Sequence, residues 1–121
     1  MSKQHNPGFL AVVNDAKKRV KEISIAQYQQ QPFGVLIDVR EDNEWAHGRL
    51  PNAVHIGRGV LERDIESKFP DKTTTLVLYC GGGFRSALAA DMLQVMGYQD
   101  VYSLDGGYRG WVDAGLAVVK E

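Results

Sequence analysis

Cysteine is almost absent from this chain, because Cys80 is the only one among 121 residues. A single cysteine excludes an internal disulfide and any metal site built from several cysteines. Long apolar runs are also missing, and no stretch approaches the roughly 20 residues of a membrane-spanning helix. Neither sign of charge dominates, since 14 Lys and Arg residues stand against 15 Asp and Glu residues. This balance gives no indication of nucleic-acid or membrane partners.

The amino terminus is polar, and the apolar stretch behind it is too short for a secretory signal peptide. We therefore expect a cytoplasmic protein, in a reducing compartment that keeps Cys80 available as a free thiol. The sequence indicates no cofactor and no metal ion.

The length suits one domain with a single hydrophobic core, which we assign to residues 1–121. Apolar strand-like segments alternate with helix-like segments over most of the chain. The strand candidates are residues 35–39, 53–56, 76–79 and 101–104, and the helix candidates are residues 41–47, 60–69, 86–96 and 108–114. This alternation predicts an α/β fold with a mostly parallel central sheet of four to five strands and helices on both faces.

The amino-terminal region predicts a helical extension of the domain over residues 1–21. Its helical pattern runs over residues 9–23, with Val20 and Ile23 on the apolar side, and a small edge strand starts at residues 23–25. This helix either covers the sheet or meets a second copy of the chain. The helix over residues 86–96 is assigned an inward face made of Leu88, Met92, Val95 and Met96.

Right-handed crossovers bring the carboxyl ends of parallel strands to one edge of a sheet, where α/β folds keep their sites. Four polar or glycine-rich segments follow such strand ends: Asp38 with Arg40, residues 56–59, residues 80–86 and residues 105–107. We expect these segments to converge on one crevice.

Cys80 lies where an apolar strand ends and a helix begins, directly before three glycines. Backbone N–H groups in a tight glycine loop form an anion-binding concavity. The next helix adds its positive end, and Arg85 adds a full charge. Each feature favours the thiolate, which is the nucleophilic form of cysteine. The alternative is a small buried hydrophobic residue, which is the usual state of a lone cysteine.

Three of these segments resemble the signature motifs of the rhodanese-like sulfurtransferases. They are residues 37–41 with residues 48–56, then the Cys80 loop, and finally residues 104–111. The resemblance covers about residues 22–115 and implies the three-layer rhodanese-like fold. Arg49 departs from the family, which often has histidine at this position, and Asn52 replaces the more usual glycine.

The resemblance implies sulfur transfer through a persulfide on Cys80. The thiolate attacks the outer sulfur of a donor such as thiosulfate, and cyanide or a thiol then accepts that sulfur in a ping-pong scheme. The anion-binding loop consists of Gly81, Gly82, Gly83, Phe84, Arg85 and Ser86.

Other side chains near this crevice have more than one interpretation. Arg85 either holds an anionic donor or pairs with a carboxylate at the rim, and Phe84 is expected to form an apolar lip. In the family pattern Asp38 braces the loops. Arg40 and Arg58 either attract an anionic donor or are solvated surface residues.

Competing functions remain open at this point. Cys80 could relay sulfur between protein partners, as persulfide donors or acceptors, with little small-molecule turnover. A non-catalytic binding module is disfavoured because the cysteine is kept, and a redox sensor has no second cysteine in the chain. Cysteine phosphatases place arginine six positions after the nucleophile, whereas Arg85 comes five positions after Cys80.

Overall fold

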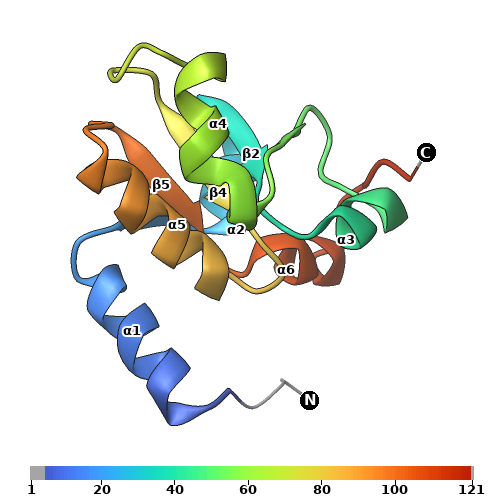
Figure 1. Ribbon diagram of the computed structural model, residues 1–121. Helices are drawn as coiled ribbons and strands as arrows, with labels where there is room; N and C mark the ends of the chain where they lie inside the picture. The colour runs from blue at the N-terminus through green and yellow to red at the C-terminus, as the bar shows by residue number, and fades with distance from the viewer. Residues whose placement is uncertain (1–4, 121) are drawn as a thin grey trace.

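Five parallel strands form the centre of the protein, with helices on both faces of the sheet (Figure 1). The computed structural model describes residues 5–120, so residues 1–4 and 121 of the expected single domain lie outside the described part. The strands are β1 (Lys21–Ile23), β2 (Val35–Asp38), β3 (Val54–His55), β4 (Leu76–Tyr79) and β5 (Val101–Leu104). Their order is β1-β5-β4-β2-β3, and each neighbouring pair is parallel. The predicted α/β architecture is confirmed.

Over residues 5–120, six α-helices and one short 3₁₀ helix connect or flank these strands. They are α1 (Pro7–Lys17), α2 (Ile25–Gln30), α3 (Asp42–His47), η1 (Arg58–Val60), α4 (Leu61–Lys68), α5 (Phe84–Val95) and α6 (Gly107–Asp113). Within the described residues, no helix is long and apolar enough to cross a membrane.

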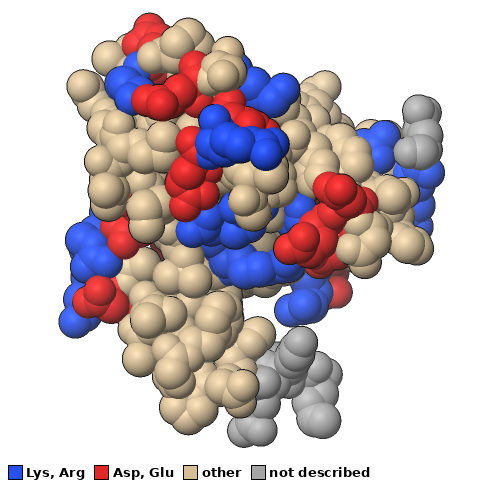
Figure 2. Space-filling view, in the orientation of Figure 1, with Lys and Arg blue, Asp and Glu red and all other residues tan. Residues whose placement is uncertain are grey.

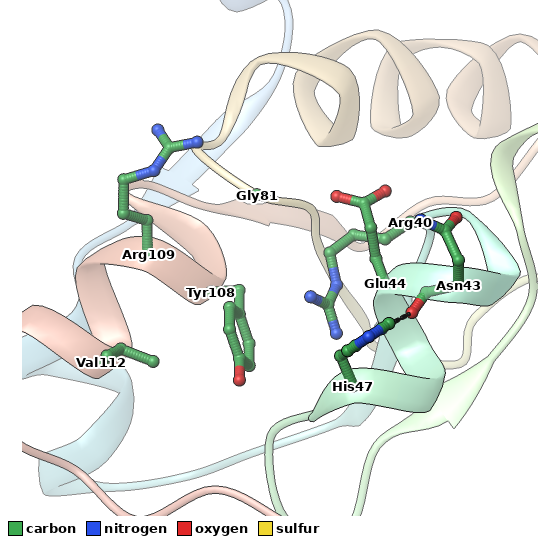
Figure 3. A pocket seen from close by; sticks show the side chains of 8 residues that line it. All are labelled: Arg40, Asn43, Glu44, His47, Gly81, Tyr108, Arg109 and Val112. Carbon is green, nitrogen blue, oxygen red and sulfur yellow. Dashed lines mark hydrogen bonds between the residues drawn. The ribbon is translucent and has the colours of Figure 1, made fainter. Parts of the chain in front are cut away.

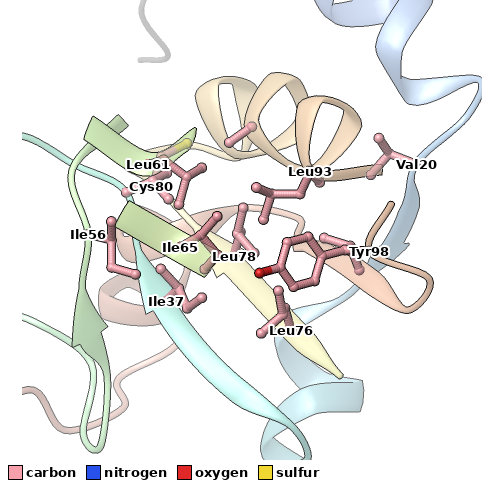
Figure 4. Packing of buried hydrophobic residues seen from close by; sticks show 14 residues of the cluster. Val20, Ile37, Ile56, Leu61, Ile65, Leu76, Leu78, Cys80, Leu93 and Tyr98 are labelled. Atoms are coloured by element: carbon pink, nitrogen blue, oxygen red, sulfur yellow. The ribbon is translucent and has the colours of Figure 1, made fainter. Parts of the chain in front are cut away.

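The core is split between the two faces of the sheet because successive strand side chains point in opposite directions. On one face Leu76 and Leu78 pack with Leu61 of α4 and Leu93 of α5, and Cys80 lies in the same cluster (Figure 4). On the other face Tyr79 packs in a second cluster that includes residues of α2 and α6. All four residues of β4 are buried, as expected for the central strand.

The predicted helix over residues 9–23 is too long. α1 ends at Lys17, and Ile23 instead belongs to β1, where it pairs with Leu104 of β5. Pairing with β5 provides hydrogen-bond partners for the backbone N–H and C=O groups of this segment at the edge of the sheet. α1 itself packs on the domain, since Arg19, just beyond its end, bonds Asp91 of α5 with an Nη2···Oδ2 distance of 2.7 Å.

The inward face predicted for the helix before Gly97 is wrong at Met92 and Val95, whereas Met96 does pack against the core. Val95 is 75% exposed and Met92 is 38% exposed. The buried residues of α5 are instead Ser86, Ala87, Ala89, Ala90 and Leu93. Alanine side chains let α5 lie close to the sheet on one side and to α1 on the other. The small residues therefore determine which face of α5 is buried.

Candidate active site

Cys80 is held in a short loop between the end of β4 and the start of α5. The amide N–H groups of Gly83 and Ser86 donate to its sulfur, with N···Sγ distances of 3.2 and 3.3 Å. The thiol lies 3.6 Å from the Ser86 hydroxyl and donates to it. That hydroxyl is bonded in turn to the hydroxyl of Ser103, 2.8 Å away. Loop amides therefore point at the sulfur, as the glycine-rich sequence predicts.

Two glycines from different parts of the chain make this loop possible. Gly83 has a φ of +95°, and a Cβ there would lie 3.1 Å from the backbone nitrogen of Gly106. Gly107 has a φ of +56°, and its Cβ would overlap the carbonyl oxygen of Cys80. Only a residue without a side chain adopts this left-handed backbone at such close approach.

The first turn of α6 fixes the loop from the other side. The Tyr108 amide donates to the Cys80 carbonyl at 2.8 Å, and the Arg109 amide donates to the Gly81 carbonyl at 2.9 Å. With these carbonyls bound to α6, the loop presents its N–H groups to the sulfur. The loop after β5 thus supports the geometry of the loop after β4.

Cys80 lies at the floor of a cavity of about 450 Å³. The residue as a whole is only 1% exposed. Glu44, Arg85 and Arg109 contribute charged groups to the cavity walls, and Phe84 contributes an aromatic ring. Cys80 therefore lines the cavity with almost no exposed surface, so a reacting group must enter the cavity to reach the sulfur.

Arg85 forms the salt bridge that was one of its two expected roles. Its Nη1 and Nη2 lie 3.1 and 3.2 Å from the two carboxylate oxygens of Glu44. The hydrogen bond from Arg85 to Glu44 raises the pKa of Arg85, despite its partial burial. Burial opposes ionisation of Glu44, but hydrogen bonds from Arg85 and from the Glu41 amide keep the Glu44 pKa below its ordinary value. Both partners are therefore charged at neutral pH.

Arg109 also flanks the Cys80 loop, although its sequence position did not single it out as a candidate. A Cβ on Gly82 would lie 3.2 Å from Arg109 Nη1, so the guanidinium lies directly over the loop. Arg109 forms no salt bridge within residues 5–120. The sequence feature that could have identified Arg109 is its position in the first turn of a helix that follows a strand end and two glycines.

Asp38 and Arg40 form a buried pair next to the cavity. Asp38 is 0% and Arg40 is 3% exposed, and Arg40 Nη2 lies 2.8 Å from Asp38 Oδ2. The Tyr79 hydroxyl also donates to Asp38, at 2.6 Å, and the Arg40 guanidinium lies over the Tyr108 ring with its Cζ 4.2 Å from the ring centre. The interpretation of Arg40 as a solvated surface residue is wrong, because it is buried and its charge is paired with Asp38.

Arg58 is not part of the Cys80 cavity. It lies in η1 and bonds Glu62 one turn later, with an Nη1···Oε1 distance of 2.7 Å. Such a partly exposed pair contributes about 0.5 kcal/mol at most. Of the two interpretations given for Arg58, the surface arginine is the closer to this geometry, because its side chain is 29% exposed and pairs with Glu62.

The apolar mouth of the cavity is formed partly by α1, which no sequence pattern indicated. The ring centre of Phe84 lies 4.5 Å from that of His5 and 6.1 Å from that of Phe9. Lys17 Nζ lies 5.3 Å from the Phe84 ring centre. The expected position of Phe84 as an apolar lip therefore agrees with this aromatic group.

Charge gathers near this cavity. Figure 2 shows Lys and Arg side chains next to carboxylates in the region of α3 and α6. In the described part of the chain, no group of three or more His, Cys, Asp and Glu side chains could hold a metal ion. The electrostatic field in the cavity therefore comes from charged side chains and from the N–H dipoles of the loop.

The chain is similar to known proteins over nearly its whole length. The model of the family described as rhodanese-like domain matches residues 15–114. A putative sulfurtransferase, YtwF of Bacillus subtilis (strain 168), is 36% identical over 96 residues, covering 76% of this chain and 90% of the relative. Thiosulfate sulfurtransferase GlpE of Pseudomonas syringae pv. syringae (strain B728a) is 34% identical over 86 residues, covering 71% and 79%.

A solved structure with a similar fold is that of a Rhodopseudomonas palustris CGA009 protein of unknown function, described as a possible tyrosine phosphatase. It is 29% identical, has a TM-score of 0.82, and the match covers 98% of this chain and 99% of that chain. The family match begins seven residues before the predicted start at residue 22 and therefore includes the end of α1. The extent of the family match, together with the identity to these relatives, shows that the chain belongs to the rhodanese-like domain family.

Proposed function

We propose that this protein is a sulfurtransferase that moves sulfane sulfur from an anionic donor such as thiosulfate to a thiophilic acceptor, through a persulfide on Cys80. The observation that carries the proposal is the pair of amide N–H groups, from Gly83 and Ser86, that point at the sulfur within 3.3 Å. The relatives named as sulfurtransferases support the same reaction class.

Further loop amides are available for the second sulfur atom. Within residues 5–120, the N–H groups of Gly81, Gly82, Phe84 and Arg85 have no hydrogen-bond acceptor outside α5. Phe84 and Arg85 are the first two residues of α5, where an α-helix has no internal acceptor. Oriented N–H groups of this kind stabilise a developing anion without reorganisation. We assign them to the terminal sulfur of the persulfide.

The reaction conserves its electrons in two displacements. The Cys80 thiolate attacks the outer sulfur of thiosulfate, a new S–S bond forms, and the old S–S bond breaks so that sulfite leaves with the electron pair. The acceptor then attacks the outer sulfur of the Cys80 persulfide. The Cys80–sulfur bond breaks, the thiolate returns, and cyanide leaves as thiocyanate.

Two guanidinium groups are placed to hold the sulfonate-like end of the donor. Arg85 and Arg109 both lie against the glycines of the loop, with Arg85 Nη2 3.3 Å from a Cβ built on Gly81 and Arg109 Nη1 3.2 Å from a Cβ built on Gly82. Arg85 is partly neutralised by Glu44, whereas Arg109 has no salt-bridge partner in the described part. We therefore assign the larger share of donor attraction to Arg109.

Two alternatives use the same thiol. A relay between protein partners would need the persulfide but little turnover of small donors. A phosphatase would need Arg85 to enclose a phosphate. The alternative is considered because a protein of similar structure is described as a possible tyrosine phosphatase. The pairing of Arg85 with Glu44 leaves the guanidinium facing a carboxylate, which disfavours that use.

Intact-protein mass spectrometry after incubation with thiosulfate tests the proposal. We expect the mass to rise by one sulfur atom and to return to its starting value after cyanide is added. Cys80→Ser is the matched control, since the hydroxyl preserves the size of the side chain and removes the nucleophile. Retained sulfur loading in this variant, or an unmodified wild-type protein that hydrolyses an aryl phosphate, would contradict the proposal.

A further inference from the structure

A second cavity, of about 440 Å³, lies beside the Cys80 cavity, between α3 and α6. The two cavities share Glu44, Gly81 and Arg109 among their lining residues. Gly81 directly follows the nucleophile in sequence, so the shared boundary lies next to Cys80. A molecule whose reacting atom reaches the sulfur can therefore extend its remaining atoms into the second cavity.

The second cavity is lined by a hydrogen-bond donor, on a largely buried side chain, that the fold does not use. Arg40 bonds Asp38 and the Gly48 carbonyl through Nε and Nη2, and Nη1 has no partner among residues 5–120. Every fully buried side-chain nitrogen or oxygen in the described part has a partner, so Nη1 reaches open space. Figure 3 shows the guanidinium pointing into the cavity, between Tyr108 and His47. A donor of this kind, on a side chain only 3% exposed, suits an anionic ligand atom.

The remaining walls combine charged, polar and apolar groups, and the polar ones are Asn43 and His47 of α3. Arg40 is balanced by Asp38 and Glu44 by Arg85, which leaves the Arg109 guanidinium as the uncompensated charge at the boundary. The Tyr108 ring and the Val112 side chain face the cavity from α6 (Figure 3). Cavities of this size and mixed character are typical of sites for small organic molecules. Cyanide is too small to react at the sulfur and also extend into this second cavity.

We propose that the cavity between α3 and α6 binds the carboxylate-bearing portion of a small thiol, which acts as the sulfur acceptor. This inference rests on the proposed sulfurtransferase function and assigns the class of its acceptor. The carboxylate accepts from Arg40 Nη1 and is attracted by Arg109, while the carbon chain lies along Tyr108 and Val112. The acceptor thiolate attacks the outer sulfur of the persulfide, the bond from that sulfur to Cys80 breaks, and the products are the acceptor persulfide and the Cys80 thiolate.

Val112 gives the sharpest test, because it is 45% exposed and tolerates replacement without loss of core packing. The experiment compares Val112→Lys, Val112→Asn and Val112→Asp, which place a positive, neutral or negative group at one position. Each variant is loaded with sulfur and discharged by 3-mercaptopropionate or by its methyl ester, and the ratio of the two kcat/KM values is measured. The ester keeps the thiol and the chain but removes the negative charge.

We expect the acid-to-ester ratio to fall roughly fivefold from Asn to Asp and to rise by a similar factor from Asn to Lys, as partly screened charges at cavity distances require. The same ratio in all three variants would overturn the acceptor site. Cyanide discharge of the wild-type persulfide is measured in parallel. If cyanide discharges the persulfide and the ratio does not respond, the acceptor site alone is wrong; if no persulfide forms, the proposed function and the acceptor site are both wrong.

Discussion

Replacing Gly107 with alanine tests whether α6 determines the geometry of the Cys80 loop. Gly107 has a φ of +56°, and an added Cβ would overlap the carbonyl oxygen of Cys80. That carbonyl accepts the Tyr108 amide at 2.8 Å, and the neighbouring Gly81 carbonyl accepts the Arg109 amide at 2.9 Å. Relief of the overlap must move α6 away from the loop and weaken both bonds.

Gly115 provides the matched control. It also has a left-handed backbone, with a φ of +79°, but a Cβ there meets nothing within 4 Å. Gly115→Ala therefore costs only the backbone term, about 1–2 kcal/mol. Gly107→Ala adds about 1 kcal/mol for each weakened hydrogen bond and about 1–3 kcal/mol for the steric overlap, which with the same backbone cost gives a total of about 4–7 kcal/mol. This cost is comparable to the whole stability of a small domain.

Urea unfolding measures the free energy of unfolding of both variants, and mass spectrometry measures their rate of sulfur loading. We expect Gly107→Ala to lose at least twice as much stability as Gly115→Ala. Its remaining folded fraction should also load sulfur more slowly, because the amides of Gly83 and Ser86 shift relative to the sulfur. Equal losses of stability in the two variants, with normal loading by Gly107→Ala, would refute the coupling of α6 to the loop.

Three further predictions concern the charged groups around the site. Tyr79→Phe removes a hydroxyl that bonds buried Asp38 and the Leu50 amide, so urea unfolding should show a loss of about 1–3 kcal/mol. The Glu44 pKa lies below its ordinary value of 4.5, so its pair with Arg85 stabilises the fold above that pH and is lost as the pH falls through the lower folded value. The free energies of unfolding of wild type and Glu44→Gln should then differ by less than about 1 kcal/mol near neutrality and become equal at low pH. A difference that does not change with pH would count against the pair. Arg109→Ala should raise KM for thiosulfate roughly fivefold with little loss of stability, and an unchanged KM would remove Arg109 from donor binding.

The strands were predictable because their residues form apolar segments bounded by glycine, proline and polar turns. The four predicted strands differ from β2, β3, β4 and β5 by at most one residue at each end. β1 was placed two residues too late because Val20 and Ile23 also fit a helical period, and only pairing with β5 decides between the two structures. Edge strands of three residues have too few positions to show their own period.

The orientation of α5 could not be read from hydrophobicity. Leu88, Met92 and Val95 are more apolar than the alanines, but the buried residues include Ala87, Ala89 and Ala90, and Val95 is largely exposed. Close packing between α1 and the sheet selects small side chains, and the sequence alone does not reveal that α1 lies there.

One feature of the site had a sequence signal that follows from strand geometry. Asp38 and Arg40 are two residues apart at the end of β2, so their side chains lie on the same side of an extended backbone. Opposite charges in this arrangement predict the ion pair seen between them, 2.8 Å apart. The aromatic group of His5, Phe9 and Phe84 had no such signal, because it depends on how α1 packs against α5.

The burial of Cys80 has a consequence for the order of events at the site. The residue is 1% exposed, and its loop is fixed by hydrogen bonds from α6, so loading brings the donor sulfur to the floor of the cavity. In the reaction that we propose, the donor sulfur enters from the cavity and stays there as the outer sulfur of the persulfide, about 2 Å beyond Sγ. On this mechanism the atom that the acceptor attacks is more accessible than the atom that the donor loads. We therefore expect the loading step to be restricted to small donors and the discharge step to accept larger thiols.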